Sequence, residues 1–165
     1  NSEGRTFSGC IYFGLMLAKN GPKVIEYNAR FGDPETQVIL PLLATDFGEI
    51  VTAIYEQRLS EIDVEWTNNA CACVVMASGG YPQKYETGKE IFGLDDNGQV
   101  ENAFVFHAGT KLADGKYLTN GGRVLGITAT AKTLDKALEK AYNAVEKIKF
   151  DGAHYRKDIG AKAVK

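Results

Sequence analysis

The sequence predicts an α+β fold, and three observations lead to it. Stretches that are apolar throughout, or that alternate apolar with polar residues, recur along the chain of 165 residues. Turn-forming pairs such as Asp114-Gly115 separate several of them, as in antiparallel hairpins. One long segment, residues 134–148, instead spaces its apolar side chains as an amphipathic helix does. The combination is typical of a mostly antiparallel sheet with a covering helix.

The first expected element is a β-hairpin. Residues 9–18 are rich in apolar and aromatic side chains, and the turn sequence of residues 19–22 precedes a second strand. That second strand is predicted to extend as far as Phe31. On it, apolar and polar side chains point to opposite faces, with Ile25, Tyr27, Ala29 and Phe31 on one face and Glu26, Asn28 and Arg30 on the other. We therefore expect one core face and one polar face.

Two helices are expected next. Asp33 as N-cap and Pro34 at the first helical position predict the start of the first, and Pro41 predicts its end near residue 40. Asp46 and Glu49 form a capping-box pattern at the start of the second. Its apolar stripe consists of Phe47, Ile50, Val51, Ile54 and Tyr55.

The sequence becomes polar over residues 59–69, which predicts a boundary between a first domain, residues 1–65, and a second, residues 66–165. In the second domain, residues 70–77 and 99–107 are expected to be strands. A hairpin over residues 112–129 should turn at Asp114-Gly115 and again at residues 120–122. The final helix, residues 134–148, should begin at Thr133 as N-cap.

Composition excludes several classes of protein. A net charge of −2 with scattered Lys and Arg gives no electrostatic footprint for nucleic acid or an anionic membrane. No apolar run approaches the ~20 residues that span a bilayer. The three cysteines, Cys10, Cys71 and Cys73, are too few and too irregular for a disulfide framework. Buried reduced thiols are the favoured interpretation over a zinc site, and the expected compartment is cytoplasmic.

The polar face of the second strand has chemistry of its own. Glu26, Asn28 and Arg30 would follow one another about 7 Å apart, given the ~3.3 Å rise per strand residue. Carboxylate and amide oxygens suit Mg²⁺, which fills its shell with phosphates and water, and a guanidinium suits phosphate. The alternative is a solvated face with a weak Glu–Arg ion pair. The preceding strand adds Tyr12, Gly14 and Met16 to this face, and no acid.

Five ordered blocks of sequence resemble one family. Residues 25–37, IEYNARFGDPETQ, are similar to the signature of the phosphoribosylamine–glycine ligases, which are ATP-grasp enzymes of purine biosynthesis. Four later blocks resemble the same family in the same order: residues 75–82 (VMASGGYP), 106–111 (FHAGTK), 121–125 (GGRVL) and 155–160 (YRKDIG). The resemblance covers nearly the whole chain.

The resemblance implies an ATP-dependent ligase that joins glycine to 5-phosphoribosylamine through a glycyl phosphate, giving glycinamide ribonucleotide. The chain would comprise the closing part of an ATP-grasp domain and a small C-terminal domain, and this portion alone is expected to be inactive. ATP, glycine and 5-phosphoribosylamine would be its small-molecule partners, with no nucleic acid or membrane. Two alternatives stay open: another ATP-grasp carboxylate–amine ligase, and a non-catalytic binding or interface module. An exposed edge of the first hairpin can also drive non-native self-association.

The resemblance also implies roles for single residues. Glu26 and Asn28 would bind the metal ion, Mg²⁺ or Mn²⁺, and Arg30 would act on phosphoryl oxygens. Asp33 would face the substrate, with a helix N-cap as the equal alternative. Lys111 and Arg123 would hold the substrate phosphate beside glycine-rich turns, although exposed hairpin charges explain them nearly as well.

Overall fold

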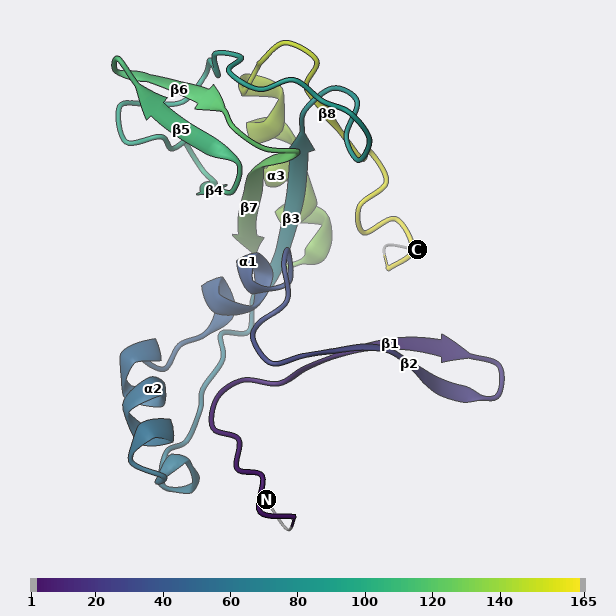
Figure 1. The fold of residues 1–165 in the computed structure, drawn as a ribbon, viewed down its shortest axis with the longest axis vertical. Helices are drawn as coiled ribbons and strands as arrows, with labels where there is room; N and C mark the ends of the chain where they lie inside the picture. The colour runs from purple at the N-terminus through teal and green to yellow at the C-terminus, as the bar shows by residue number, and fades with distance from the viewer. Residues whose placement is uncertain (1–2, 164–165) are drawn as a thin grey trace. The chain divides into compact units, whose positions relative to one another are not determined.

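The computed structural model describes residues 3–163 (Figure 1). Their contacts divide them into two compact units. The first unit extends up to Thr36 and resumes over Leu43–Thr67. The second unit combines Gln37–Leu42 with the chain from Asn68 onward. Among the described residues, no helix is long and apolar enough to cross a membrane.

The first unit contains the expected hairpin. Strand β1 (Tyr12–Ala18) pairs antiparallel with β2 (Gly21–Asn28), and the register shifts between Gly14 and Leu15 (Figure 1). The second strand is shorter than predicted, because it ends at Asn28 and the chain bends at Ala29 and Arg30. The prediction that the strand continues to Phe31 is therefore wrong.

The apolar face of this hairpin is exposed. The register places Phe13, Leu15 and Leu17 of β1 opposite Tyr27, Val24 and Pro22 of β2. Leu17 is 86% exposed and Tyr27 is 66% exposed, although the rings of Phe13 and Tyr27 meet edge to face at 5.2 Å. The expected burial of Ile25 and Tyr27 is thus wrong for this unit. Alternation identifies an apolar face, but burial needs a second layer, and a two-stranded ribbon has none of its own.

The two predicted helices after the hairpin differ in how well their predicted starts agree with the structure. Helix α1 (Thr36–Ile39) begins at Thr36, whose amide donates to the Gly32 carbonyl at 3.0 Å, so the expected start at Pro34 is wrong. The 3₁₀ turn η1 (Leu40–Leu42) contains Pro41 and confirms the predicted end. Helix α2 (Phe47–Tyr55) begins as expected, since Asp46 accepts a hydrogen bond from the Glu49 amide at 3.0 Å.

The apolar stripe of α2 is largely solvent-exposed. Phe47, Val51 and Tyr55 are exposed, and the helix buries Ala53 completely. A short 3₁₀ turn, η2 (Leu59–Glu61), follows in the polar stretch. Both α2 and the hairpin therefore present apolar surface that this unit does not cover.

The second unit is the mostly antiparallel sheet that the sequence predicts. Strands β3 (Ala70–Ala77), β4 (Phe104–His107), β7 (Arg123–Ala131) and β8 (His154–Tyr155) form a sheet in the order β4-β7-β3-β8. Strands β5 (Thr110–Ala113) and β6 (Lys116–Thr119) make a separate hairpin that turns at Asp114-Gly115. Helix α3 (Leu134–Lys147) packs on β3 and β7 (Figure 1).

Strand β4 is shorter than the predicted residues 99–107. The backbone amides of Asn97 and Gln99 donate to the Asp95 side chain, and the Gln99 side chain exchanges two hydrogen bonds with the Val105 backbone. Side chains thus satisfy the backbone where a longer strand would have used a partner strand. The segment before Phe104 is consequently a turn.

The core lies between α3 and the sheet. Val74, Met76, Leu125 and Ile127 are buried on the strands and form one core cluster with buried positions of the helix, namely Ala141, Ala144 and Val145. Each large side chain buried in this way contributes roughly 1.5–3 kcal/mol. Thr133 caps α3 as predicted, accepting from the Lys136 amide at 3.4 Å. This core fixes β7, the strand that begins at Arg123.

Candidate functional site

Glu26 and Asn28 lie side by side on the polar face of the hairpin. The register places Glu26 opposite Gly14, and Asn28 opposite Tyr12. The Asn28 Nδ2 donates a hydrogen bond to Glu26 Oε1 at 3.1 Å. Glu26 is exposed and Asn28 is half-buried, so the pair is open to solvent. The structure therefore brings together the two residues that the sequence suggests as metal ligands.

The chemistry of this pair fits a hard cation. A carboxylate and an amide carbonyl are oxygen donors, and Mg²⁺ commonly takes one or two such protein ligands beside phosphates and water. Within the described residues, no group of three or more His, Cys, Asp and Glu side chains could hold a metal ion. A metal bound at Glu26 and Asn28 would consequently complete its shell with ligands that the protein does not supply.

Tyr12 and Glu35 extend the polar face, and the alternation of β2 gives no indication of Glu35. The pKa of the Tyr12 phenol is raised, first by desolvation and then by Glu35, which also accepts a hydrogen bond from it. The negative charge of Glu26 adds to the effect. Because both carboxylates act on one phenol, the two acids lie near the same side chain. The sequence could have indicated Glu35 only through its place in the family signature, where it follows Asp33-Pro34 directly.

Arg30 is not on the strand. It lies in the bend after β2, and its Nη1 donates to the Phe31 carbonyl at 2.6 Å. The expected row of three polar groups on one strand is therefore wrong for Arg30, because β2 stops two residues earlier. The contact given for the Arg30 guanidinium is with the Phe31 carbonyl, whereas the Glu26 carboxylate accepts from Asn28.

Asp33 is exposed in the turn that precedes α1. Since α1 begins at Thr36 and the Gly32 carbonyl closes its first turn, Asp33 does not occupy the N-cap position that the sequence suggested. Its placement on the substrate side stays a prediction.

Lys111 and Arg123 follow two turns that pack against each other within the second unit. The Asn120 amide donates to the Gly109 carbonyl at 2.7 Å, and a Cβ on Gly109 would lie 2.7 Å from Gly121 Cα. Ser78 joins the same cluster, donating through its hydroxyl to the Gly121 carbonyl at 2.8 Å. These glycines are thus explained by close backbone packing. Both Lys111 and Arg123 are exposed, and their role in binding a phosphate stays a prediction.

His107 is held in place by contacts on both sides of its ring. Its Nδ1 is 2.9 Å from Thr110 Oγ1 and its Nε2 is 2.9 Å from the Gly98 carbonyl oxygen. Because a carbonyl only accepts, Nε2 donates to the Gly98 carbonyl. The ring also packs on Tyr117 with centroids 5.1 Å apart. Both nitrogens are occupied by contacts that fix the loop.

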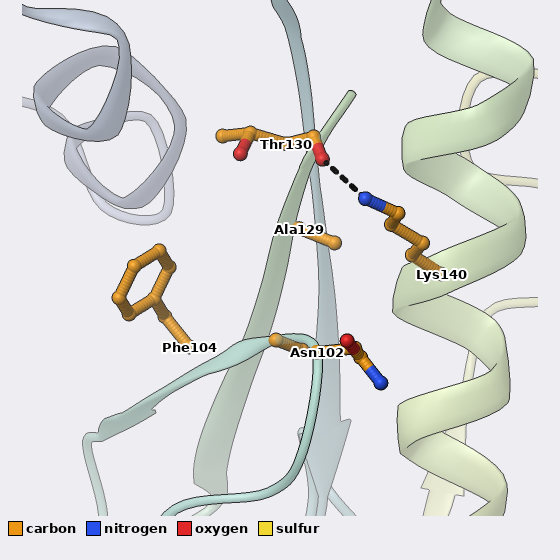
Figure 2. A pocket seen from close by; sticks show the side chains of 6 residues that line it. Asn102, Phe104, Ala129, Thr130 and Lys140 are labelled. Carbon is orange, nitrogen blue, oxygen red and sulfur yellow. Dashed lines mark hydrogen bonds between the residues drawn. The ribbon is translucent and has the colours of Figure 1, made fainter. Parts of the chain in front are cut away.

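A shallow cavity of about 320 Å³ lies on the second unit between the edge of the sheet and α3 (Figure 2). Phe104, Ala129 and Thr130 line it from the strands, together with Asn102, and the ammonium of Lys140 donates to the Thr130 carbonyl at 3.3 Å. The cavity contains none of the predicted site residues. Its only charged lining group is already bonded to the backbone.

The cysteines are free thiols, as expected. Cys10 and Cys71 are half-buried and Cys73 is buried. Burial raises the pKa of the Cys71 thiol to about 11, and the nearby Cys73 adds to the shift. A thiol held protonated in this way is a poor metal ligand and a poor nucleophile at neutral pH.

Comparison with models of known protein families identifies the family of this chain. The C domain of phosphoribosylglycinamide synthetase matches residues 71–162, and the ATP-grasp (A) domain of the same synthetase matches residues 1–36. Two domains of one synthetase therefore match successive parts of the chain. The chain belongs to the phosphoribosylglycinamide synthetase family, which confirms the resemblance seen in the sequence.

Individual relatives agree with this assignment. A phosphoribosylamine–glycine ligase of Caldanaerobacter subterraneus is 54% identical over 159 residues, which cover 96% of this chain and 37% of that protein. The trifunctional purine biosynthetic protein adenosine-3 of Bos taurus is 52% identical over 98% of this chain and 16% of its own length. The crystal structure of the Thermotoga maritima phosphoribosylamine–glycine ligase matches with a TM-score of 0.77 and 42% identity, covering 90% of this chain and 36% of that one. The chain thus spans little more than a third of the single-function ligases that it matches.

Proposed function

We propose that this chain is the carboxyl-terminal portion of an ATP-dependent ligase that joins glycine to 5-phosphoribosylamine. Residues 1–65 would close the ATP-grasp domain and residues 66–165 would form the C domain. The observation that carries the proposal is the adjacent pair Glu26 and Asn28 on the exposed polar face of β2, inside the segment that matches the ATP-grasp model. The portion alone, lacking the rest of the ligase, would be inactive.

The proposed reaction has two steps. The carboxylate of glycine attacks the γ-phosphorus of ATP, releasing ADP and forming glycyl phosphate, in which phosphate is a good leaving group. The amine of 5-phosphoribosylamine then attacks the acyl carbon, and phosphate leaves as glycinamide ribonucleotide forms. This is a step of purine biosynthesis, and the enzyme would work in the cytoplasm on small molecules.

Each named residue has a part in this proposal. Glu26 and Asn28 hold the divalent ion, Mg²⁺ or Mn²⁺, which when bound neutralises phosphate charge. Arg30 would stabilise charge on the phosphoryl oxygens, as a fixed guanidinium does in phosphoryl transfer. Its place on a bend does not prevent this, because the side chain is long and exposed. Asp33, Lys111 and Arg123 would contact the substrates.

The test is metal dependence of the full-length ligase that contains this chain. In Glu26→Ala and Asn28→Ala, the Mg²⁺ concentration for half-maximal activity should rise by at least about 10-fold, as when metal sites lose a supporting group. Glu61→Ala, an exposed acid on η2, is the matched control and should leave it unchanged. Wild-type metal dependence in both site variants would sink the proposal.

A second candidate is a non-catalytic interface module, and the exposed apolar face of the hairpin favours it. Phe13, Leu15 and Leu17 lie on that face without cover from their own unit. In the isolated chain, the same face would drive self-association. Sedimentation of the chain over a range of concentrations tests this, and Leu17→Lys should return it to the monomer.

Another kind of ATP-grasp ligase is disfavoured, because residues 71–162 match the C domain of one particular synthetase.

A further inference from the structure

Gly14 lies directly beneath the side chain of Glu26. The two residues are register partners across the hairpin. A Cβ built on Gly14 would lie 2.8 Å from Glu26 Cγ, 3.6 Å from its Oε1 and 3.7 Å from its Cδ. Non-bonded carbons prefer about 3.5–4.0 Å, so a Cβ at this position is incompatible with the observed conformation of the Glu26 side chain, which would have to move. The Glu26 side chain therefore lies flat across β1 at this point.

The backbone at Gly14 does not itself require glycine. The glycines with φ in the left-handed region include Gly9 and Gly21 on either side of β1, and Gly14 is not among them. A glycine inside a strand weakens the strand and often marks a bulge or a close approach. Here both occur, because the register shifts immediately after Gly14. A glycine at position 14 thus has two possible explanations, the bulge in the hairpin and the close contact with Glu26.

We propose that Gly14 is a positioning residue for the Glu26 carboxylate. Its missing side chain lets Glu26 lie across β1, where Oε1 accepts from Asn28 Nδ2 at 3.1 Å and the two side chains stay together. Alanine at this position would push the Glu26 side chain away from the strand and separate it from Asn28. The consequence for metal binding rests on the proposed function, whereas the consequence for the Glu26–Asn28 hydrogen bond does not.

Metal binding is measured on the full-length ligase by electron paramagnetic resonance of free Mn²⁺, with a non-hydrolysable ATP analogue present. Gly14→Ala should weaken Mn²⁺ binding by about 10-fold, the usual effect of losing an orienting partner of a metal ligand. The matched control is Gly48→Ala in α2, where a Cβ would likewise approach a carboxylate oxygen, Asp46 Oδ1, at 2.9 Å. That control should bind Mn²⁺ as the wild type does. Equal binding by Gly14→Ala and the wild type would overturn the metal part of the inference.

A double-mutant cycle separates the contact from the bulge. If Gly14 acts through Glu26, then Gly14→Ala has no further effect on Mn²⁺ binding in a Glu26→Ala background. An undiminished effect in that background would assign Gly14 to the hairpin backbone and overturn the proposal.

The hydrogen bond is tested in this chain by itself, which keeps the result separate from the fate of the proposed function. In NMR spectra, Gly14→Ala should move the side-chain amide resonances of Asn28 toward those of the Glu26→Ala variant. If Glu26→Ala leaves metal dependence unchanged but this shift occurs, the proposed function fails and the positioning role stands. An unmoved Asn28 amide in Gly14→Ala defeats the positioning role, whatever the metal binding.

Discussion

The backbone amide of Lys89 donates a hydrogen bond to Thr119 Oγ1 at 3.0 Å, and Thr119 is fully buried. Thr119→Val keeps the shape of the side chain but leaves this part-buried amide without its acceptor. The free energy of unfolding should fall by about 1 kcal/mol, because the amide loses its hydrogen bond where solvent only partly replaces it. Urea unfolding followed by circular dichroism measures it. An unchanged midpoint would show that the hydroxyl does not hold the loop.

Thr128 is a matched comparison for Thr119, because the same substitution is expected to have the opposite effect on stability. It is also fully buried, on β7, but its hydroxyl has no hydrogen-bond partner among the described residues. Thr128→Val removes a polar group whose burial is not compensated, so we expect the chain to be equally stable or more stable by about 1 kcal/mol. The same urea measurement applies. A loss of stability as large as that of Thr119→Val would mean that the Thr128 hydroxyl is satisfied by a solvent molecule.

Sequence reasoning succeeded where the signal is local. The cap at Thr133 and the helical spacing of residues 134–148 predict α3 without reference to the rest of the chain, and the helix ends one residue earlier, at Lys147. The apolar run of residues 70–77 similarly defined β3 to the residue. The predicted strand over residues 99–107 was too long, because the Gln99 side chain bonds the Val105 backbone where a partner strand was expected. Sequence reasoning also failed for the burial of Tyr27, because no periodicity reveals whether another layer covers an apolar face.

The candidate site divides in the same way. Strand alternation alone places Glu26 and Asn28 on one face, and the structure agrees. The predicted place of Arg30 on the strand was wrong, because alternation cannot locate the bend that ends β2. Glu35 was missed because a turn, rather than a period of two, brings it to Tyr12. Contacts made by turns need the three-dimensional structure.

Gly109→Ala should destabilise the second unit strongly. A Cβ there would lie 2.5 Å from the Arg123 carbonyl oxygen and 2.7 Å from Gly121 Cα, and backbone atoms cannot move aside as a flexible side chain can. Overpacking of this kind costs about 1–3 kcal/mol. Leu112→Ala, at an exposed site on the adjoining strand β5, is the control and should change stability by less than about 0.5 kcal/mol. Equal effects of the two substitutions would contradict the close packing of the turns.

Cys71 should resist alkylation at neutral pH. Burial disfavours its thiolate and raises its pKa to about 11, so only a very small fraction is ionised at pH 8. Because the thiolate is the reacting form, the rate of modification by iodoacetamide should keep rising with pH up to about 11 in the folded chain. Mass spectrometry of the peptide containing Cys71 follows the reaction. In denaturant the rate should level off near the ordinary thiol pKa of about 8.5, and the same profile in the folded chain would show that Cys71 is accessible to solvent.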